Sequence, residues 1–340
     1  MNDVKAGGFS TVVIVGATGA VGREFLALIE QRGWSCRRYV MLASARSVGK
    51  TVRLGNREFI VEELCDDSFH DVDLALFSAG GEFSKRFAPA AVEAGAVVVD
   101  NSSAFRMTPD VPLVVPEINP ADAREHRGII ANPNCSTIIM VVATWPLHRV
   151  NPVRRIVVST YQAASGAGLG AMEELRQQTR DVLDGRPAQP RAFPVQCAFN
   201  VFSHNSPIDA TGYNAEERKM IAETRKIFHD EAIQVTATCV RVPVLRAHSE
   251  SVNLTFERPI TPGEVREILA AAPGVRVVDQ LDPPHFPMPV EADGIDDVLV
   301  GRIRQDLSQP DGRGIELFLS GDQLRKGAAL NAIQIAELLG

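Results

Sequence analysis

The chain has no long hydrophobic run, no paired cysteine motif and no block of basic residues. Its longest apolar stretches, such as residues 138–143, are far shorter than the roughly 20 residues that a membrane-spanning helix needs. The five cysteines are an odd number without a CxxC pair, which argues against a disulfide framework or a structural zinc site. With no cleavable signal pattern at the N-terminus, these absences predict a cytoplasmic globular protein.

The charge balance is mildly acidic. Lys and Arg number 35 against 42 Asp and Glu, which gives a formal net charge of −7 at pH 7. An acidic chain without basic clusters is a poor candidate for binding nucleic acid or an anionic membrane surface, so neither partner is expected. At roughly 100–200 residues per domain, the 340 residues predict two domains.

The first part of the chain alternates short apolar runs with segments of helical period. Strands are expected at residues 11–15, 39–42, 58–61, 73–77, 96–99 and 129–131. Runs that are apolar on both faces and alternate with helices are typical of a parallel sheet covered on both sides. The pattern predicts an α/β, Rossmann-like dinucleotide-binding domain over residues 1–133, and a final amphipathic helix at residues 324–339.

The part between them, residues 134–321, has more strands and fewer helices, which is typical of an α+β domain with a mixed sheet. Strands are expected at residues 156–161, 235–240, 251–256, 298–304 and 315–319. Helices are expected at residues 171–183, 215–228 and 263–270. We interpret this part as a second, α+β domain.

A glycine-rich turn follows the first predicted strand, in the sequence VVIVGATGAVG. Gly16, Gly19 and Gly22 give a GxxGxxG spacing, which lets backbone N–H groups approach a pyrophosphate at a helix N-terminus. An ordinary strand-to-helix turn is the alternative. The cofactor contacts predicted in this turn are Gly16, Thr18, Gly19, Ala20, Val21 and Gly22.

The end of the second strand bears on which dinucleotide is bound. An NAD site usually has an acidic residue there for the ribose 2′-OH, but this chain reads MLASARSVGK. The hydroxyl and cationic groups of Ser44, Arg46, Ser47 and Lys50 suit a 2′-phosphate, so NADP(H) is favoured, with Arg46 and Ser47 as contacts. A solvated loop position is the other interpretation of Arg46.

Cys135 lies in the sequence NPNCST, directly before an apolar run able to form a helix. A thiol at a helix N-terminus is favoured as thiolate by the helix dipole and the free N–H groups. A buried structural cysteine is the alternative, and it is the interpretation for Cys36, Cys65, Cys197 and Cys239. A dehydrogenase with a nucleophilic cysteine implies aldehyde or acyl chemistry through a thioester.

Taken together, the motifs GATGAVG, NSSAFRM, NPNCST, STYQAASGAG and RVPVLRAH resemble the bacterial type of the aspartate-β-semialdehyde dehydrogenase family. They run in the family's order up to the C-terminal LRKGAALNAIQIAE, so the resemblance covers essentially the whole chain. It implies NADPH-dependent reduction of L-aspartyl-4-phosphate to L-aspartate-4-semialdehyde through a cysteine thioester, with release of phosphate. It further implies a step of lysine, methionine and threonine biosynthesis. The first domain is then completed by the C-terminal helix within 322–340, and residues 134–321 form a catalytic and dimerisation domain through which a homodimer assembles.

The resemblance also implies residue roles. The catalytic residues are the nucleophile Cys135, the acyl-positioning Gln162 and the general acid/base His248. The substrate-binding residues are Arg241 for the α-carboxylate, Glu216 for the ammonium group, and Arg106, Lys219, Asn134 and Ser102 for phosphate. Further cofactor contacts are Ser165, Gly166 and Asn331.

Plainer interpretations stand beside these roles. Glu216 and Lys219 have the i,i+3 spacing of an ordinary ion pair on an exposed helix face, and a histidine at a strand edge, such as His248, is often a surface residue. An N-acetyl-γ-glutamyl-phosphate reductase is the enzymatic alternative, although its substrate lacks the free ammonium that Glu216 would bind. A non-catalytic dinucleotide-binding paralogue is the other.

Overall fold

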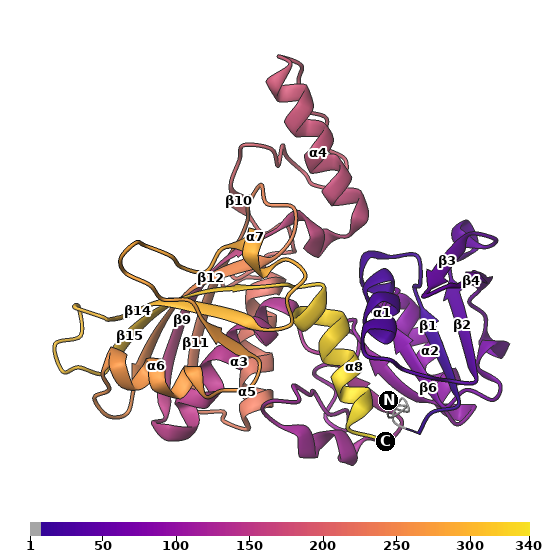
Figure 1. Ribbon diagram of the computed structural model, residues 1–340, viewed down its shortest axis with the longest axis horizontal. Helices are drawn as coiled ribbons and strands as arrows, with labels where there is room; N and C mark the ends of the chain where they lie inside the picture. The colour runs from indigo at the N-terminus through magenta and orange to yellow at the C-terminus, as the bar shows by residue number, and fades with distance from the viewer. Residues whose placement is uncertain (1–7) are drawn as a thin grey trace. The chain divides into compact units, whose positions relative to one another are not determined.

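The computed structural model describes residues 8–340, which form two compact units (Figure 1). Unit 1 contains the residues up to Asn134 together with Ala328–Gly340, and unit 2 contains Cys135–Gly327. Within the described residues, no helix has both the length and the apolar character needed to cross a membrane.

Unit 1 is built on a six-stranded sheet in which every strand pair is parallel, in the order β5-β2-β1-β6-β7-β8. Its strands are β1 (Thr11–Val15), β2 (Arg38–Ala43), β5 (Glu62–Glu63), β6 (Leu74–Phe77), β7 (Val97–Asp100) and β8 (Ile129–Ala131). The predicted parallel α/β fold is therefore confirmed. The β-branched, fully buried run of β1 explains its central place, because such a strand is covered on both faces.

Two apolar cores cover the two faces of this sheet, and β1 supplies alternate residues to each. Val12 and Ile14 face one core, where helices α1 (Ala20–Gln31) and α8 (Leu330–Glu337) pack. The next residues, Val13 and Val15, face the other core, where α2 (Gly81–Glu93) packs. The C-terminal helix thus shares a core with the first helix of the chain.

One strand prediction for unit 1 was wrong in its placement. The segment predicted at residues 58–61 forms β4 (Arg57–Ile60), which pairs antiparallel with β3 (Thr51–Leu54) in a separate two-stranded sheet. The two strands are joined by a turn at Gly55, whose φ of 58° is easily adopted only by glycine. Because β4 is largely exposed, its apolar residues did not require a place in the parallel sheet.

Unit 2 contains a seven-stranded mixed sheet in the order β10-β11-β9-β12-β15-β14-β13. Its strands are β9 (Val153–Gln162), β10 (Phe202–Ser203), β11 (Gln234–Arg241), β12 (His248–Phe256), β13 (Val275–Val277), β14 (Val298–Gln305) and β15 (Gly314–Gly321). The five predicted strands are present. The two edge strands, β10 and β13, were not predicted because two or three residues carry no clear alternation.

The helices of unit 2 are α3 (Cys135–Val150), α4 (Leu169–Leu183), α5 (Ala215–Phe228), α6 (Pro262–Ala270) and the single turn α7 (Pro289–Ala292). Helix α3 is buried almost all round along its first ten residues and packs against the sheet. Helix α4 extends away from the sheet of unit 2 (Figure 1). Short irregular helices occur at η1 (Ala45–Ser47), η2 (Asp66–Phe69), η3 (Pro120–Glu125), η4 (Ala164–Ala167) and the π-helical η5 (Arg325–Ala329).

Strand register in unit 2 brings three predicted site residues to one end of the sheet. The last residues of the parallel strands β9 and β11 are paired, Gln162 opposite Arg241. Strand β12 runs antiparallel to β9 and places Ser249 opposite Tyr161, so its first residue, His248, lies at the same end. Residues that are distant in sequence therefore meet where β9 and β11 finish and β12 begins.

Candidate active site

Cys135 is the first residue of α3, as the sequence predicted. The first N–H groups of a helix have no partner within it, and their partial positive charge favours a thiolate. The side chain is partly buried, and Gly327 lies against it: a Cβ built on Gly327 would be 3.0 Å from the Cβ of Cys135. Only a glycine allows the chain to pass so close to the thiol without displacement.

Gln162 links the beginning of α3 to α5. Its Nε2 donates to Ser136 Oγ at 3.0 Å and to Glu216 Oε1 at 3.1 Å. The side chain is buried, and in the described part of the chain its Oε1 has no hydrogen-bond partner. The amide is therefore fixed through its nitrogen, and its oxygen remains able to accept a bond from a bound molecule.

Glu216 and Lys219 do form the ion pair that their spacing predicts, with Nζ 3.0 Å from Oε2. The prediction that such a pair lies on an exposed helix face was wrong for Glu216, which is buried. The beginning of α5 is fixed by a capping box in which Asn214 Oδ1 accepts from Glu217 N and Glu217 accepts from Asn214 N. This cap holds the first turn of α5, and with it Glu216, against the end of the sheet.

Arg241 is buried and held on two sides. Its Nη1 donates to Ala163 O at 2.8 Å, and its Nη2 lies 2.9 Å from His204 Nε2. The guanidinium carbon lies 5.4 Å from the ring centroid of Phe193, a cation–π arrangement. Two of the five N–H donors are used by these contacts, and the Nε–H has no partner among the residues described here. The remaining donors can bind an anion.

His248 is completely buried, so the interpretation of this histidine as a surface residue was wrong. The backbone N–H of Ala163 donates to its Nδ1 at 3.0 Å. Since that nitrogen accepts, the neutral ring carries its proton on Nε2, which is buried and has no partner within residues 8–340. Burial, followed by the nearby Arg241 guanidinium, lowers the pKa of His248 to about 3, so the ring is neutral at physiological pH.

Gly166 brings the loop η4 close to these two side chains. A Cβ on Gly166 would lie 3.1 Å from both Arg241 Nη1 and His248 Nε2, so only a glycine leaves this space open. The neighbouring Ser165 is hydrogen-bonded to the side chain of Gln323. Gln323 Oε1 in turn accepts from Ala247 N at 2.8 Å, directly before His248. Gln323 thus ties the loop to the histidine strand.

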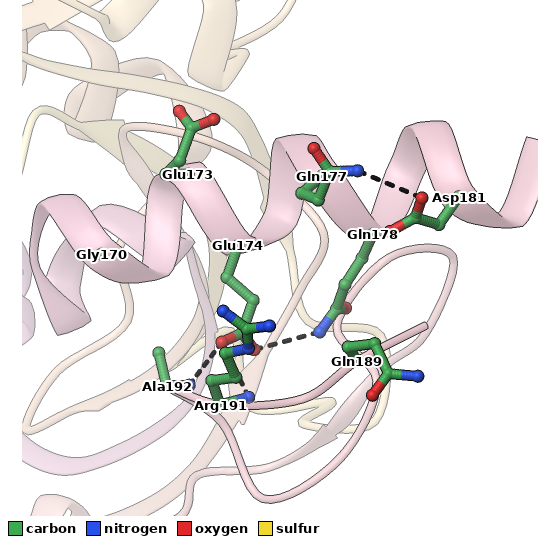
Figure 2. Close-up of a pocket in the computed structure, with 9 residues that line it drawn as sticks. All are labelled: Gly170, Glu173, Glu174, Gln177, Gln178, Asp181, Gln189, Arg191 and Ala192. Atoms are coloured by element: carbon green, nitrogen blue, oxygen red, sulfur yellow. Dashed lines mark hydrogen bonds between the residues drawn. The ribbon is translucent and has the colours of Figure 1, made fainter. Parts of the chain in front are cut away.

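Figure 2 shows a hollow of unit 2 between α4 and residues 189–192, which the predicted site does not use. Glu174 on α4 accepts backbone bonds from Arg191 at 2.8 Å and from Ala192, and Gln178 Oε1 accepts from Cys197 N at 2.7 Å. The side chains around the hollow mainly anchor the loop that carries Phe193. We interpret the residues around the hollow as structural support for the loop that holds the Phe193 ring beside Arg241.

The glycine-rich turn of unit 1 is as close-packed as its spacing suggests. Gly16 has a φ of 86°, and a Cβ there would lie 2.4 Å from Ser78 O. A Cβ on Gly22 would lie 2.2 Å from Gly16 O. Both Gly16 N and Ala17 N donate to Leu42 O, which fixes the turn at the carboxyl end of β2. Helix α1 begins directly after the turn, with Gly19 as its N-cap.

The loop after β2 meets this turn through hydroxyl groups. Thr18 Oγ1 donates to Ser47 Oγ at 3.2 Å, and Lys50 Nζ lies 3.4 Å from the same oxygen. Arg46 is exposed beside them in η1. No acidic residue ends β2, so the predicted hydroxyl and cationic groups gather next to the glycine turn.

The other predicted residues of unit 1 are strongly engaged in its own structure. Arg106 is buried, and its side chain donates to the carbonyl oxygens of Asn132 and Asn101 at 2.9 and 3.0 Å. Ser102 Oγ donates to Asp100 Oδ2 at 2.7 Å. Asn331 is buried in α8 and donates to Val114 O and Asn132 Oδ1. Asn134, the last residue before α3, is also buried.

Comparisons with known proteins show which family the two units resemble. The domain model described as "Semialdehyde dehydrogenase, NAD binding domain" matches residues 11–126, and the one described as "Semialdehyde dehydrogenase, dimerisation domain" matches residues 145–326. The aspartate-semialdehyde dehydrogenase of Synechocystis is 57% identical over 328 residues, covering 96% of each chain. That of Prochlorococcus marinus is 51% identical over 329 residues, covering 97% of this chain and 95% of the relative.

The chain belongs to the aspartate-semialdehyde dehydrogenase family.

A solved structure of the family agrees with this. Aspartate semialdehyde dehydrogenase II of Vibrio cholerae, complexed with ASA, has a TM-score of 0.93 and 46% identity, covering 97% of each chain. The family resemblance and the fold expected from the sequence are confirmed, and the comparisons favour aspartate-semialdehyde dehydrogenase over the N-acetyl-γ-glutamyl-phosphate reductase and non-catalytic alternatives. The protein is an oxidoreductase of this family with a dinucleotide-binding domain.

Several residues of the candidate site in this family member were not anticipated. His204, Gln323 and Phe193 contact predicted residues but lie in segments without a recognisable motif. Glu250, two residues after His248 on β12, is fully buried, and in the described chain neither carboxyl oxygen has a hydrogen-bond partner. Burial raises the pKa of Glu250 well above its ordinary value, which favours the neutral acid. Only the alternation of β12 placed it on the face of His248.

Proposed function

We propose that this chain catalyses the NADPH-dependent reductive dephosphorylation of L-aspartyl-4-phosphate to L-aspartate-4-semialdehyde, in lysine, methionine and threonine biosynthesis. The observation that carries the proposal is the meeting of Gln162, Arg241 and His248 at one end of the unit 2 sheet, in the unit whose first residue is Cys135. Family membership supplies the substrate.

The turn of unit 1 fits a dinucleotide. The missing side chains of Gly16 and Gly22 leave the backbone able to approach a pyrophosphate at the N-terminus of α1. Ser47 and the cations Arg46 and Lys50 suit a 2′-phosphate, which supports NADP(H). When bound, the cofactor supplies the hydride that reduces the acyl carbon. We further propose Ser165 and Gly166 as contacts on the nicotinamide side and Asn331 as an additional cofactor contact, on the strength of the family pattern.

Cys135 begins the reaction. Its thiolate attacks the acyl carbon of the aspartyl phosphate, the carbon–oxygen bond to phosphate breaks, and phosphate leaves with the electron pair, so that a thioester to Cys135 remains. The α3 N-terminus stabilises the thiolate. Gln162, fixed through its Nε2 to Ser136 and Glu216, presents an Oε1 that has no partner among residues 8–340, and it orients the acyl group.

His248 acts on the oxygen of the acyl group. Hydride addition turns the thioester carbonyl into a hemithioacetal oxyanion, and the Nε2–H of His248 donates to the developing negative charge. Collapse of this intermediate breaks the carbon–sulfur bond, frees the aldehyde and returns Cys135 to the thiolate. For His248 to act as a base through Nε2 as well, its proton must first move to Nδ1, which gives up the hydrogen bond from Ala163 N; uptake of a proton on Nε2 then forms the imidazolium that burial disfavours.

Arg241 and Glu216 bind the amino-acid end of the substrate. The buried Arg241, whose Nε–H has no partner in the described part of the chain, suits the α-carboxylate, and the buried carboxylate of Glu216 suits the ammonium group. Lys219 is proposed as a phosphate ligand in unit 2. The same role for Arg106, Ser102 and Asn134 of unit 1 is supported by the family motifs NSSAFRM and NPNCST.

The dimerisation-domain match supports a homodimer, which we propose to act in the cytoplasm on small-molecule substrates, without nucleic-acid partners. The decisive experiment is phosphate-dependent reduction of NADP⁺ with aspartate semialdehyde, compared with N-acetylglutamate semialdehyde and with NAD⁺. We expect turnover with aspartate semialdehyde, NADP⁺ and phosphate. Turnover with the N-acetylated aldehyde instead, or none by folded protein, would refute the proposal.

A further inference from the structure

His204 occupies a fixed place behind Arg241. It follows the edge strand β10 directly, and its backbone N–H donates to Cys239 O at 2.8 Å, which continues the pairing of β10 with β11. Its side chain is half-buried, and its Nε2 lies 2.9 Å from Arg241 Nη2. Because a guanidinium nitrogen can only donate, Nε2 is the acceptor of this bond.

The second ring nitrogen continues the chain of hydrogen bonds. With Nε2 accepting, the neutral ring carries its proton on Nδ1, which lies 3.1 Å from Ser206 Oγ. Burial is the main cause that lowers the pKa of His204 to about 4, so the ring is neutral near pH 7. The backbone N–H of Ser206 also points at Nδ1, at 3.3 Å, and this longer contact is given up when Nδ1 carries the proton and donates it to the hydroxyl oxygen.

Ser206 connects this series of hydrogen bonds to α5. Its hydroxyl oxygen accepts from Glu216 N at 3.1 Å and donates to Asn214 Oδ1 at 3.3 Å. Asn214 is the N-cap of α5. The donors and acceptors therefore run in one consistent direction, from Arg241 through His204 and Ser206 to the N-cap of the helix that carries Glu216.

We propose that His204 is a positioning residue that holds the Arg241 guanidinium in register with Glu216, so that the two groups match the spacing between the α-carboxylate and the ammonium group of one amino-acid substrate. This inference rests on the substrate roles proposed above for Arg241 and Glu216. No sequence motif had assigned a role to His204. Nη1 of Arg241 is held by Ala163 O, so His204 fixes the other side of the guanidinium plane.

Two substitutions of His204 separate the loss of its hydrogen bonds from the loss of its ring. His204→Ala removes both the acceptor for Arg241 and the donor to Ser206. His204→Gln retains a carbonyl oxygen that can accept from Arg241 and an amide that can donate to Ser206. His285→Ala is a suitable control, because His285 is an exposed histidine of the same unit that contacts Glu291, away from the site.

The experiment measures kcat and KM for aspartate semialdehyde with NADP⁺ and phosphate in the wild type and these three variants, after circular dichroism has verified folding. We expect H204A to raise KM for the semialdehyde at least tenfold while kcat falls less than threefold. We expect H204Q to restore KM to within about threefold of the wild type, and H285A to match the wild type. KM for NADP⁺ should stay within twofold in all variants.

Three results would overturn the inference. An unchanged KM in H204A would show that Arg241 needs no such support, and a loss of kcat at constant KM would place His204 in the chemical step instead. An H204Q variant as impaired as H204A would point to ring packing alone. If the wild type itself failed to turn over aspartate semialdehyde, the proposed function would fall and this inference with it, an outcome distinct from the other three.

Discussion

Three ionisable groups of unit 2, the half-buried His204 and the fully buried His248 and Glu250, should make its stability depend on pH in opposing ways. His204 and His248 have pKa values lowered to about 4 and about 3 by burial, whereas Glu250 has a raised pKa. Between pH 6 and pH 5 the folded chain keeps both histidine rings neutral, and the raised pKa of Glu250 favours its protonated form. As the pH falls through this interval, the unfolded chain takes up protons on the histidines, whereas its glutamate stays mostly ionised.

The histidines and Glu250 change the free energy of unfolding with pH in opposite directions. A histidine with a depressed folded pKa stabilises the fold fully above its unfolded pKa, and this stability is lost as the pH falls. Glu250, with a raised pKa, stabilises the fold at low pH, and this stability is lost as the pH rises. From an unfolded pKa of about 6.5, each histidine lowers the free energy of unfolding by about 1.2 kcal/mol as the pH falls from 6 to 5, and Glu250 acts in the opposite direction.

Two substitutions separate these contributions. The two histidines together cost about 2.4 kcal/mol over this interval in the wild type, and Glu250 offsets part of this cost. His204→Gln should make the loss about 1.2 kcal/mol smaller than in the wild type, and Glu250→Gln should make it larger. All other titrating groups are common to the three proteins and cancel in the comparison.

Urea unfolding at pH 6.0 and 5.0 provides the measurement. The chain has two tryptophans, Trp34 in unit 1 and Trp145 on α3 in unit 2. In a Trp34→Phe background the fluorescence of Trp145 reports unit 2 alone, so the unfolding of unit 1 does not enter the signal. Equal pH dependence in all three proteins, or a shallower dependence in E250Q, would refute the assigned protonation states.

Three further predictions concern catalysis. Cys135→Ala should abolish both turnover and covalent trapping of the acyl group, while Cys65→Ala, at an exposed cysteine, should retain both; trapping by C135A would refute the nucleophile. Gly166→Ala should lower kcat/KM at least tenfold with an unchanged melting temperature, because the new methyl group would lie 3.1 Å from side-chain atoms of Arg241 and His248. Gly170→Ala serves as the control, because a methyl group there meets no atom within 4 Å. Arg46→Ala should raise KM for NADPH at least tenfold and that for NADH less than threefold; equal effects in a steady-state comparison would exclude a 2′-phosphate contact.

Local sequence patterns predicted those parts of the site that local structure determines. The glycine turn before α1 and the place of Cys135 at the first residue of α3 both depend on residues adjacent in sequence. The pairing of Gln162 with Arg241 follows from strand register, which the sequence does not specify over a separation of 79 positions. The resemblance to a family, and not periodicity, brought these two residues together.

The supporting residues were missed for a related reason. His204 and Gln323 act through bonds to partners that are distant in sequence, and nothing in their own neighbourhoods distinguishes them from surface residues. Glu250 was missed because a carboxyl group on a strand normally indicates an exposed face, and here burial overrides that pattern. The misplaced strand at residues 58–61 shows the same limit, because β propensity does not say which sheet a strand joins.

The assembly of unit 1 from both ends of the chain has a consequence for the order of folding during synthesis. Glu337 binds Arg32 through both carboxylate oxygens at 2.7 Å and accepts from Trp34 Nε1 at 3.1 Å, and the apolar side of α8 fills the core against α1. A ribosome synthesises these residues after unit 2, so the nascent cofactor-binding unit waits with an open apolar face while the whole of unit 2 is made. Unit 2, contiguous in sequence, is the part of the chain able to finish folding first.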